Sequence, residues 1–179
     1  ENILITGGAG FIGAHLSRTL LADGHKVVVA DDFTLGNREN VADCLENPNF
    51  TLVEQDVTDV ERLVALMEEY QIERVYHLAA NSDIQKSAKV PGIDYDKTFN
   101  TTYSVVEAMR RTGCKKLFFA STSAVYGDKA GINMTEEIGG LAPISYYGGA
   151  KLASEALISS YVSMCDMNVV IFRFPNVIG

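Results

Sequence analysis

The sequence predicts a doubly wound α/β fold, in which helices cover both faces of a parallel sheet of about six to seven strands. Three features of the chain support this prediction. Short, nearly continuously apolar segments recur along it, as expected for parallel strands that are buried on both faces. Amphipathic helical stretches separate most of these segments, and a glycine-rich turn joins the first segment to the first helix.

The predicted strands and helices follow one another along the chain. The strands are rich in β-branched and aromatic residues and cover Asn2–Thr6, Lys26–Asp31, Phe50–Glu54, Arg74–Leu78, Lys116–Ala120 and Val169–Phe172. The helices cover Phe11–Ala22, Val60–Tyr70, Asp94–Arg111 and Tyr147–Met164. Because the carboxyl ends of parallel strands meet at one edge of a sheet, the loops that follow the strands should line a ligand site. These loops are Thr6–Gly10, Asp31–Arg38, Ala79–Pro91, Ser121–Ser145 and Arg173–Gly179.

The composition fits a single globular domain over residues 1–179, with 47% hydrophobic and 21% charged residues. A formal net charge of −8 argues against a general affinity for nucleic acid or anionic membranes, which needs clustered Lys and Arg.

The three separated cysteines predict neither a disulfide framework nor a metal site and favour a reducing cytoplasm. No apolar run approaches the length of a membrane span, so we expect a soluble protein. His15, His25 and His77 lack metal-ligand spacing, and His77 is interpreted as a hydrogen-bonded structural residue.

The segment TGGAGFIG, Thr6–Gly13, follows the first strand directly and opens the first helix. Its second part fits the pattern G-x-G-x-x-G, in which glycines permit a tight turn and a close approach of the backbone to a pyrophosphate. Backbone N–H groups and the helix dipole then face the phosphates. A glycine turn between a strand and a helix can be only a turn, but its context here favours a dinucleotide site. The predicted cofactor contacts in this segment are Gly7, Gly10, Phe11, Ile12 and Gly13.

The carboxylate of Asp31, at the end of the second predicted strand, bears on the choice of dinucleotide. It lies about 20 residues past the glycine turn, where the dinucleotide fingerprint places an acid for the adenosine ribose hydroxyls. An anion there repels a 2′-phosphate, so NAD is favoured over NADP. The adjacent Asp32 is a second cofactor-binding candidate. The alternative for both residues is a solvated acid at a strand end.

Tyr147 and Lys151 lie four residues apart on one predicted helix, downstream of a cluster of hydroxyl side chains at 121–123. A tyrosine with a pKa near 10 is a poor base at neutral pH and needs a nearby cation. The i, i+4 spacing places Lys151 on the same helical face, where it should lower the pKa of Tyr147. Tyr146 has no lysine four residues on and is interpreted as a packing residue. Together with the glycine turn, the pair indicates nicotinamide chemistry.

In these motifs the chain resembles the extended short-chain dehydrogenase/reductase family, to which sugar-nucleotide epimerases and dehydratases belong. The resemblance covers the whole chain. It rests on TGGAGFIG, the strand-end Asp31, DV at 56–57, HLAA at 77–80, STSAVYGD at 121–128, YGGAK at 147–151 and RFPNVIG at 173–179. The pattern is most similar to the UDP-glucose 4-epimerases, in which the catalytic Ser or Thr precedes the valine of VYG by three positions. That residue is Thr122 here.

The resemblance implies a Rossmann fold, NAD as cofactor, a UDP-glucose or UDP-galactose substrate and catalysis by Thr122, Tyr147 and Lys151, and it leaves a homodimer open. Tyr147 would remove the proton of the sugar 4-hydroxyl while hydride moves from C4 to NAD. The 4-keto sugar would then turn over before hydride returns. The implied NAD contacts also include Asp56, Val57, Leu78, Ala79, Ala80 and Phe174, and the implied substrate contacts are Thr122, Ser123, Tyr147 and Asn176.

Several alternatives stay open within this resemblance. A 4,6-dehydratase needs acidic residues directly after the catalytic Thr, where this chain has Ser123 and Ala124. Another epimerase or a decarboxylase remains open, as does an NAD-binding domain without turnover. At the level of single residues, Thr122 could be a simple loop hydroxyl whose hydrogen bonding Ser121 or Ser123 shares. Asn100 either orients Lys151 through water or pins its helix to the sheet.

Two features depart from the family pattern. Family members continue into a smaller C-terminal substrate region that is absent here. We therefore interpret the chain as a truncated N-terminal part that holds NAD but has little or no turnover by itself. The loop Asn81-Ser82-Asp83 also lacks a lysine that some epimerases carry near this point.

Overall fold

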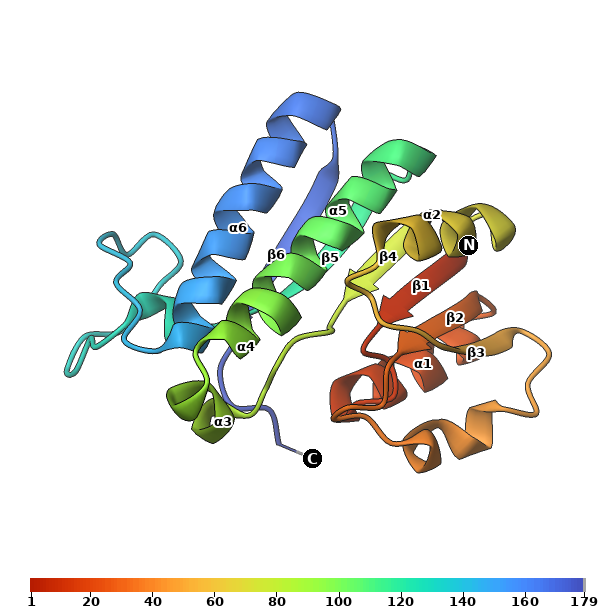
Figure 1. The fold of residues 1–179 in the computed structure, drawn as a ribbon, viewed down its shortest axis with the longest axis horizontal. Helices are drawn as coiled ribbons and strands as arrows, with labels where there is room; N and C mark the ends of the chain where they lie inside the picture. The colour runs from red at the N-terminus through yellow and green to blue at the C-terminus, as the bar shows by residue number, and fades with distance from the viewer. Residues whose placement is uncertain (179) are drawn as a thin grey trace.

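A computed structural model describes residues 1–178, apart from the side chain of Ile84. Its centre is a sheet of six parallel strands in the order β3-β2-β1-β4-β5-β6 (Figure 1). The order reverses direction between β1 and β4, as in a doubly wound Rossmann sheet. The predicted fold class is therefore confirmed. The strands are β1 (Asn2–Thr6), β2 (Lys26–Asp31), β3 (Phe50–Glu54), β4 (Arg74–His77), β5 (Lys116–Thr122) and β6 (Asn168–Phe174).

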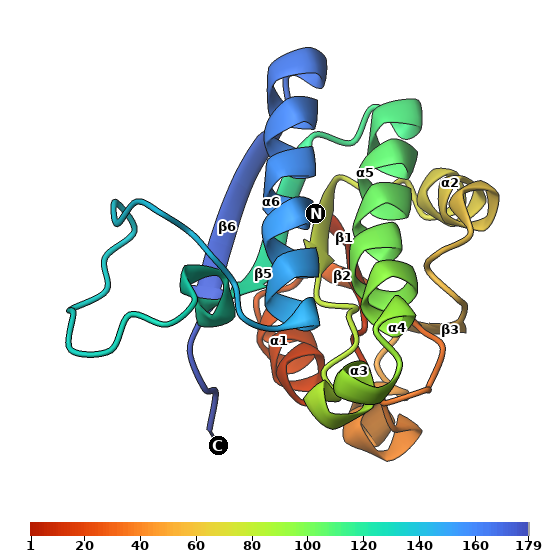
Figure 2. The ribbon, with the colours of Figure 1, turned by 60° about the vertical axis from the view of Figure 1, so that its left-hand side comes forward.

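Helices pack on both faces of this sheet. Figures 1 and 2 show α2 (Val60–Glu69), α5 (Asn100–Thr112) and α6 (Tyr146–Cys165) along one face and α1 (Phe11–Ala22) on the other. Successive side chains of β1 enter two different cores, because they alternate across the sheet. Leu4 packs in the core under α2, α5 and α6, whereas Ile3 and Ile5 pack in the core under α1. Burial on both faces explains why the central strands β1 and β2 are nearly continuously apolar, whereas the edge strand β6 is partly exposed.

Local hydrogen bonds explain where several helices begin and end. The side chain of Asp59 accepts from the N–H of Arg62 and caps α2, and Ser145 accepts from the N–H of Gly148 and caps α6. Gly113 ends α5 in a left-handed conformation with φ +76°, which suits glycine.

The predicted loop Ala79–Pro91 contains a helix that the sequence prediction missed, α3 (Ile84–Lys89), which the Asp83 side chain caps by accepting from the N–H of Lys86. The predicted helix Asp94–Arg111 is also more irregular than expected. It starts with α4 (Gly92–Asp94) and a π-helical turn over Tyr95–Phe99 before α5 begins. A short 3₁₀ helix follows β2 over Arg38–Cys44, with an Asn37 side-chain cap, and lies outside the predicted elements.

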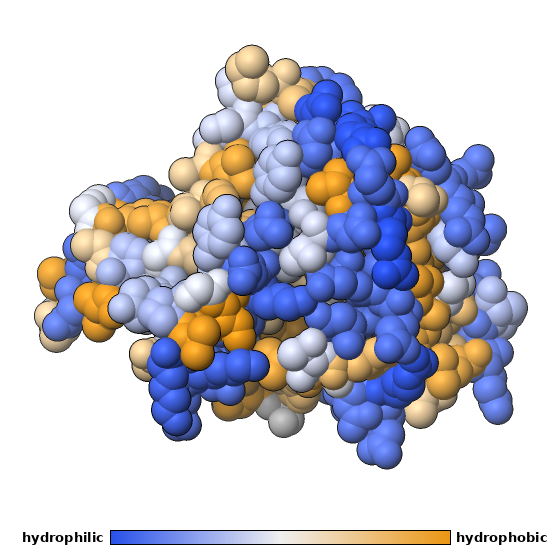
Figure 3. All heavy atoms as spheres, viewed as in Figure 1, coloured by the Kyte–Doolittle hydropathy of each residue, from blue (hydrophilic) through white to orange (hydrophobic). Residues whose placement is uncertain are grey.

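The segment between β5 and α6 projects from the body of the molecule, which is visible at the left of Figures 1 and 2. It begins with a 3₁₀ helix over Ser123–Tyr126. In the space-filling view of Figure 3 it forms a lobe that mixes hydrophobic and hydrophilic residues. Its exposed apolar side chains are Ile132, Met134 and Ile144. Within residues 1–178, no helix combines the length and the apolar character needed to cross a membrane.

Candidate active site

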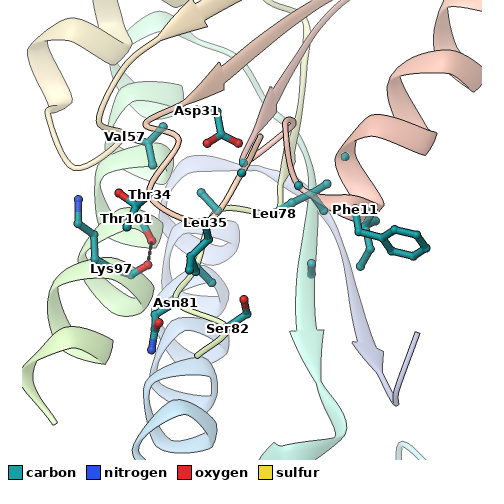
Figure 4. Close-up of a pocket in the computed structure, with 18 of the residues that line it drawn as sticks. Phe11, Asp31, Thr34, Leu35, Val57, Leu78, Asn81, Ser82, Lys97 and Thr101 are labelled. Atoms are coloured by element: carbon teal, nitrogen blue, oxygen red, sulfur yellow. Dashed lines mark hydrogen bonds between the residues drawn. The ribbon is translucent and has the colours of Figure 1, made fainter. Parts of the chain in front are cut away.

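A cleft of about 560 Å³ opens at the carboxyl edge of the sheet. Its walls come from the ends of β1, β2, β4 and β5, the starts of α1 and α6, and the turn of helix before α5. Figure 4 shows Asp31 and Val57 at one end of the cleft, Phe11 at the start of α1, and Lys97 and Thr101 on the helix opposite. This is the point where the strand order reverses, which is the usual ligand position in an open parallel sheet.

The glycine turn lines the bottom of the cleft, and its backbone packs so closely against neighbouring backbone that larger residues would not fit at Gly7 and Gly13. Gly7 has φ +68°, and a Cβ on it would lie 2.8 Å from the backbone of Ala79. A Cβ on Gly13 would lie 2.5 Å from the Cα of Gly8, so the start of α1 packs directly on the turn. No side chain caps α1, whose N-cap residue is Gly10. The first-turn N–H groups are thus left for a ligand, and the helix dipole favours an anion at this point.

Asp31 is a wall residue that the protein itself uses. One carboxylate oxygen accepts from the N–H of Ala9 in the glycine turn, and the other accepts from the N–H of Phe33, each at 2.9 Å. The side chain is almost fully buried, and burial raises the pKa of this carboxyl in spite of the two N–H donors. Asp31 thus joins β2 to the glycine turn while still lining the cleft.

Lys97 is a site residue that sequence reasoning missed. Its ammonium bridges Asp56 at 2.7 Å and Asp32 at 3.1 Å, and all three residues line the cleft. Burial alone would raise the pKa of both carboxyls, but hydrogen bonds from Lys97 and from neighbouring residues outweigh it and leave each pKa below its usual value. No local pattern in the sequence pointed to Lys97, because its partners lie 65 and 41 residues away.

Tyr147 and Lys151 both line the cleft from the first turns of α6. The Lys151 ammonium lies 5.9 Å from the centre of the Tyr147 ring and donates to the carbonyl oxygen of Ala120 at 2.6 Å. Lys151 is 2% exposed, and burial lowers its pKa to about 7. The two side chains share a helical face, as their spacing predicted.

The expected lowering of the Tyr147 pKa is wrong in its direction. Burial raises the pKa of Tyr147, with a smaller contribution from the negative charge of Asp94. The Lys151 ammonium donates to the β5 backbone and is itself destabilised by burial. The neighbouring Tyr146 is 57% exposed and lines no part of the cleft, so its interpretation as a packing residue is also wrong.

The hydroxyl cluster is divided by the end of β5. Ser121 and Thr122 are the last residues of the strand and line the cleft, whereas Ser123 begins the 3₁₀ helix outside it. The Thr122 hydroxyl accepts from the N–H of Ala124 at 3.1 Å. Its own proton stays available for donation. The sequence prediction placed these residues in a loop, because the strand was expected to end at Ala120.

His77 is a buried structural residue, as predicted. Its two ring nitrogens lie 2.7 Å from the hydroxyl of Thr6 and 3.1 Å from that of Thr102. Burial lowers the pKa of His77 to about 3, with a smaller effect from the Lys151 charge, so the ring is neutral at pH 7. Cys44, Cys114 and Cys165 are free thiols. Over residues 1–178, no group of three His, Cys, Asp or Glu residues is arranged to hold a metal ion.

The loop after β4 is fixed by a buried amide. The Asn81 side chain donates to the Ser87 hydroxyl at 2.8 Å and to the Asp94 carboxylate at 3.2 Å. Ser82 follows it and lines the cleft. This loop lacks a lysine, as noted from the sequence, but Lys86 reaches the same cleft from α3. The cleft therefore has a cation on this side after all.

Most of the residues predicted for the site share this one cleft. They are Gly7, Gly10, Phe11, Ile12, Gly13, Asp31, Asp32, Asp56, Val57, Leu78, Ala79, Ala80, Thr122, Tyr147, Lys151 and Phe174. Ser123 and Asn176 do not line it, although Pro175 and Val177, on either side of Asn176, do. Gly179, the last residue of the RFPNVIG motif, lies outside the described residues. The cleft thus joins an anion-binding turn to a phenol and an ammonium.

Residues 3–179 match the model of the NAD dependent epimerase/dehydratase family. The chain belongs to this family. Its cofactor is NAD, and the residues present fit that group: an uncapped helix N-terminus faces the cleft and an acid stands at the end of β2.

Similar proteins within the family include enzymes with different activities. The chain is 35% identical over 177 residues to UDP-glucose 4-epimerase from Corynebacterium glutamicum, and this alignment covers 99% of the chain and 51% of the relative. The chain is 34% identical over 189 residues to UDP-glucuronic acid decarboxylase 1 from Xenopus tropicalis, and this alignment covers 100% of the chain and 42% of the relative. The crystal structure of UDP-glucose 4-epimerase from Brucella ovis in complex with NAD superimposes with a TM-score of 0.90 at 32% identity, covering 98% and 52% of the two chains. The chain thus spans about half the length of these relatives.

Proposed function

We propose that the whole protein to which these residues belong is an NAD-dependent 4-epimerase of a UDP-hexose, acting on UDP-glucose and UDP-galactose. One observation carries the proposal: Thr122, Tyr147 and Lys151 line the same cleft as the glycine turn and Asp31. Proton-transfer groups and dinucleotide-binding groups therefore share one cleft. The similarity to UDP-glucose 4-epimerases supports the choice of substrate.

The first turn of α1 and Asp31 would hold the pyrophosphate and the adenosine ribose of NAD. Bound NAD would supply the hydride acceptor and donor for C4 of the sugar. Tyr147 takes the proton of the 4-hydroxyl, and the Thr122 hydroxyl donates a hydrogen bond to the reacting oxygen. Burial disfavours the phenolate form of Tyr147, and the positive charges of Lys151 and of oxidised NAD would together favour it. After the 4-keto sugar has turned over, Tyr147 returns the proton to the oxygen.

The structure bears on the competing reaction types through the residues after Thr122. A 4,6-dehydratase needs a carboxylic acid there, but Ser123 and Ala124 occupy these positions, and Ser123 lies outside the cleft. We therefore favour epimerisation over dehydration. The similarity to a UDP-glucuronic acid decarboxylase makes decarboxylation the second candidate.

The test is a substrate panel for the whole protein with NAD, using UDP-galactose, UDP-N-acetylgalactosamine and UDP-glucuronic acid and detecting products by chromatography. We expect conversion of UDP-galactose to UDP-glucose. Release of carbon dioxide from UDP-glucuronic acid, without conversion of the hexoses, would establish the second candidate.

The Tyr147→Phe variant tests the role of the phenol in this reaction. Turnover should fall by about 100-fold or more, since positioned acid–base groups contribute on this order, while NAD affinity stays within a few-fold of the parent value. The matched control is Tyr146→Phe, one residue earlier, which should keep its turnover because Tyr146 is exposed and lies outside the cleft. Equal turnover in the two variants would show that the base lies elsewhere.

A further inference from the structure

Glu155 lies one helical turn beyond Lys151 on α6, as Lys151 lies one turn beyond Tyr147. The i, i+4 spacing places all three side chains on one face of the helix. Glu155 is 7% exposed and does not line the cleft, so it is a buried charge that the proposed reaction does not use directly.

Two partners from the sheet hold the Glu155 carboxylate. Arg173 donates to it through Nε at 3.1 Å and Nη2 at 2.7 Å, and the Ser121 hydroxyl donates to Oε1. Ser121 and Arg173 face each other in the register of β5 and β6. Glu155 thus clamps the ends of two neighbouring strands to α6.

The clamped strand end carries two parts of the site. Ala120, directly before Ser121, accepts the hydrogen bond of the Lys151 ammonium, and Thr122 directly follows Ser121. Burying a carboxylate is costly unless it is paired and fully hydrogen-bonded, which Arg173 and Ser121 achieve. A packing residue alone would not need a charge at this position.

We propose that Glu155 is a positioning residue for Tyr147 and Lys151. Anchored by Arg173 and Ser121, it fixes the end of β5 against α6 and holds a negative charge beside Lys151 that favours the ammonium form. Calling the pair catalytic rests on the proposed function, but the electrostatic role of Glu155 does not depend on it.

The charges around Lys151 decide the expected sign. Glu155 is the negative group that favours its ammonium, and the face of the Phe119 ring, with its centre 4.6 Å from Nζ, also favours a cation. Burial acts in the opposite direction and lowers the pKa of Lys151. His77, which is neutral at pH 7, lies on β4, and the Tyr147 phenol, whose pKa burial raises, faces Lys151 from the preceding turn of α6. Asp94 acts on Tyr147, and Arg173 is paired with Glu155. Removing the Glu155 charge should therefore make Lys151 lose its proton at a lower pH.

The experiment follows Lys151 directly in the whole protein labelled with [13Cε]lysine, whose resonance is identified by its absence from a Lys151→Met variant. Glu155→Gln should lower the pH midpoint of Lys151 by about one pH unit, and Arg173→Gln, which leaves the carboxylate unpaired, should raise it. The matched control is Glu107→Gln on α5, where the carboxylate also pairs with an arginine, Arg110, and a hydroxyl, that of Tyr161. This control should leave the Lys151 midpoint unchanged.

Turnover provides the second readout. In Glu155→Gln, kcat should fall about fivefold more at pH 8 than at pH 6, because a midpoint one unit lower leaves far less ammonium at pH 8. KM should be unchanged, because Glu155 does not touch the cleft. Unchanged Lys151 midpoints, or shifts in the same direction in Glu155→Gln and Arg173→Gln, would overturn the proposal. If the parent protein converts no UDP-sugar, the proposed function fails, and the lysine titration still decides the role of Glu155. If Glu155→Gln does not fold, the rise expected for Arg173→Gln decides it alone.

Discussion

The two halves of the cleft use polar groups in opposite ways. In the half formed by β1, β2 and β3, the acids are held by the protein itself: Asp31 accepts two backbone N–H groups, and Asp32 and Asp56 share Lys97. In the half formed by β5 and α6, the Lys151 ammonium is buried at a cost that lowers its pKa to about 7. The charged groups of the β1, β2 and β3 half are fixed by hydrogen bonds and ion pairs, whereas the β5 and α6 half contains a lysine that titrates near neutral pH.

The two halves therefore differ in how their charged groups affect the stability of the fold. Paired and hydrogen-bonded carboxylates rigidify a surface against which a ligand can lie. A buried lysine with a lowered pKa is costly to the fold and is typical of functional positions. We therefore expect loss of the buried charge in the β5 and α6 half to change turnover and stability in opposite directions. Loss of a paired or hydrogen-bonded carboxylate in the other half should lower both cofactor affinity and stability.

The largest effect is expected for Lys151→Met, in the half formed by β5 and α6. Turnover of the whole protein should fall by about 100-fold or more, because the phenolate of Tyr147 loses its cation. The free energy of unfolding should nevertheless rise by roughly 1–3 kcal/mol at pH 6. Removing the buried charge outweighs the loss of the hydrogen bond to Ala120 and of the contacts with the Phe119 ring and the Glu155 charge.

The pH dependence of this gain has a definite sign. The unfolded chain binds the Lys151 proton up to about pH 10.4, whereas the folded chain releases it near pH 7. The parent is therefore penalised fully below pH 7, and the penalty fades between pH 7 and pH 10. Urea titrations of the parent and of Lys151→Met at pH 6, 8 and 9.5 measure the difference. A gain that does not shrink with pH would mean that the charge of Lys151 is not the cause.

An intermediate effect is expected for Asp31→Asn, in the half formed by β1, β2 and β3. The amide can accept only one of the two N–H groups that the carboxylate accepts, so the protein should lose about 1–2 kcal/mol of stability. NAD should bind about tenfold more weakly, and the preference for NAD over NADP should narrow, because the charge that repels a 2′-phosphate is gone. Calorimetric titration with both dinucleotides measures this, with the exposed Asp43→Asn as the control. Equal or tighter binding of NADP by the parent would refute the role given to Asp31.

The smallest effect is expected for Gly149→Ala, between Tyr147 and Lys151 on α6. A Cβ on Gly149 would meet no atom within 4 Å, so the substitution should stabilise the helix by about 0.5–1 kcal/mol without changing turnover. Gly24→Ala is the matched comparison, since its Cβ also meets nothing, but its φ of +81° disfavours alanine. Thermal unfolding should move in opposite directions in the two variants. A loss of stability in Gly149→Ala would show that the start of α6 depends on the backbone freedom of this glycine.

The sequence alone determined the fold class, the glycine turn, the acid at the end of β2 and the Tyr147–Lys151 pair. These features follow from local patterns: apolar segments of strand length, glycines where a side chain would collide, and the i, i+4 spacing of a helix. Each needs only neighbours along the chain. Irregular elements such as the π-helical turn at Tyr95–Phe99 escaped the same reasoning, because their periodicity differs little from that of an ordinary helix.

The tertiary structure decided which charges meet and which are stripped of water. Lys97 finds Asp32 and Asp56 only after the sheet brings distant strand ends together, and Glu155 meets Arg173 only through the pairing of β5 with β6. Burial likewise reversed the expected direction of the Tyr147 pKa. A pKa depends on the dielectric surroundings and the three-dimensional distances of a group, neither of which is contained in the spacing of residues along a helix.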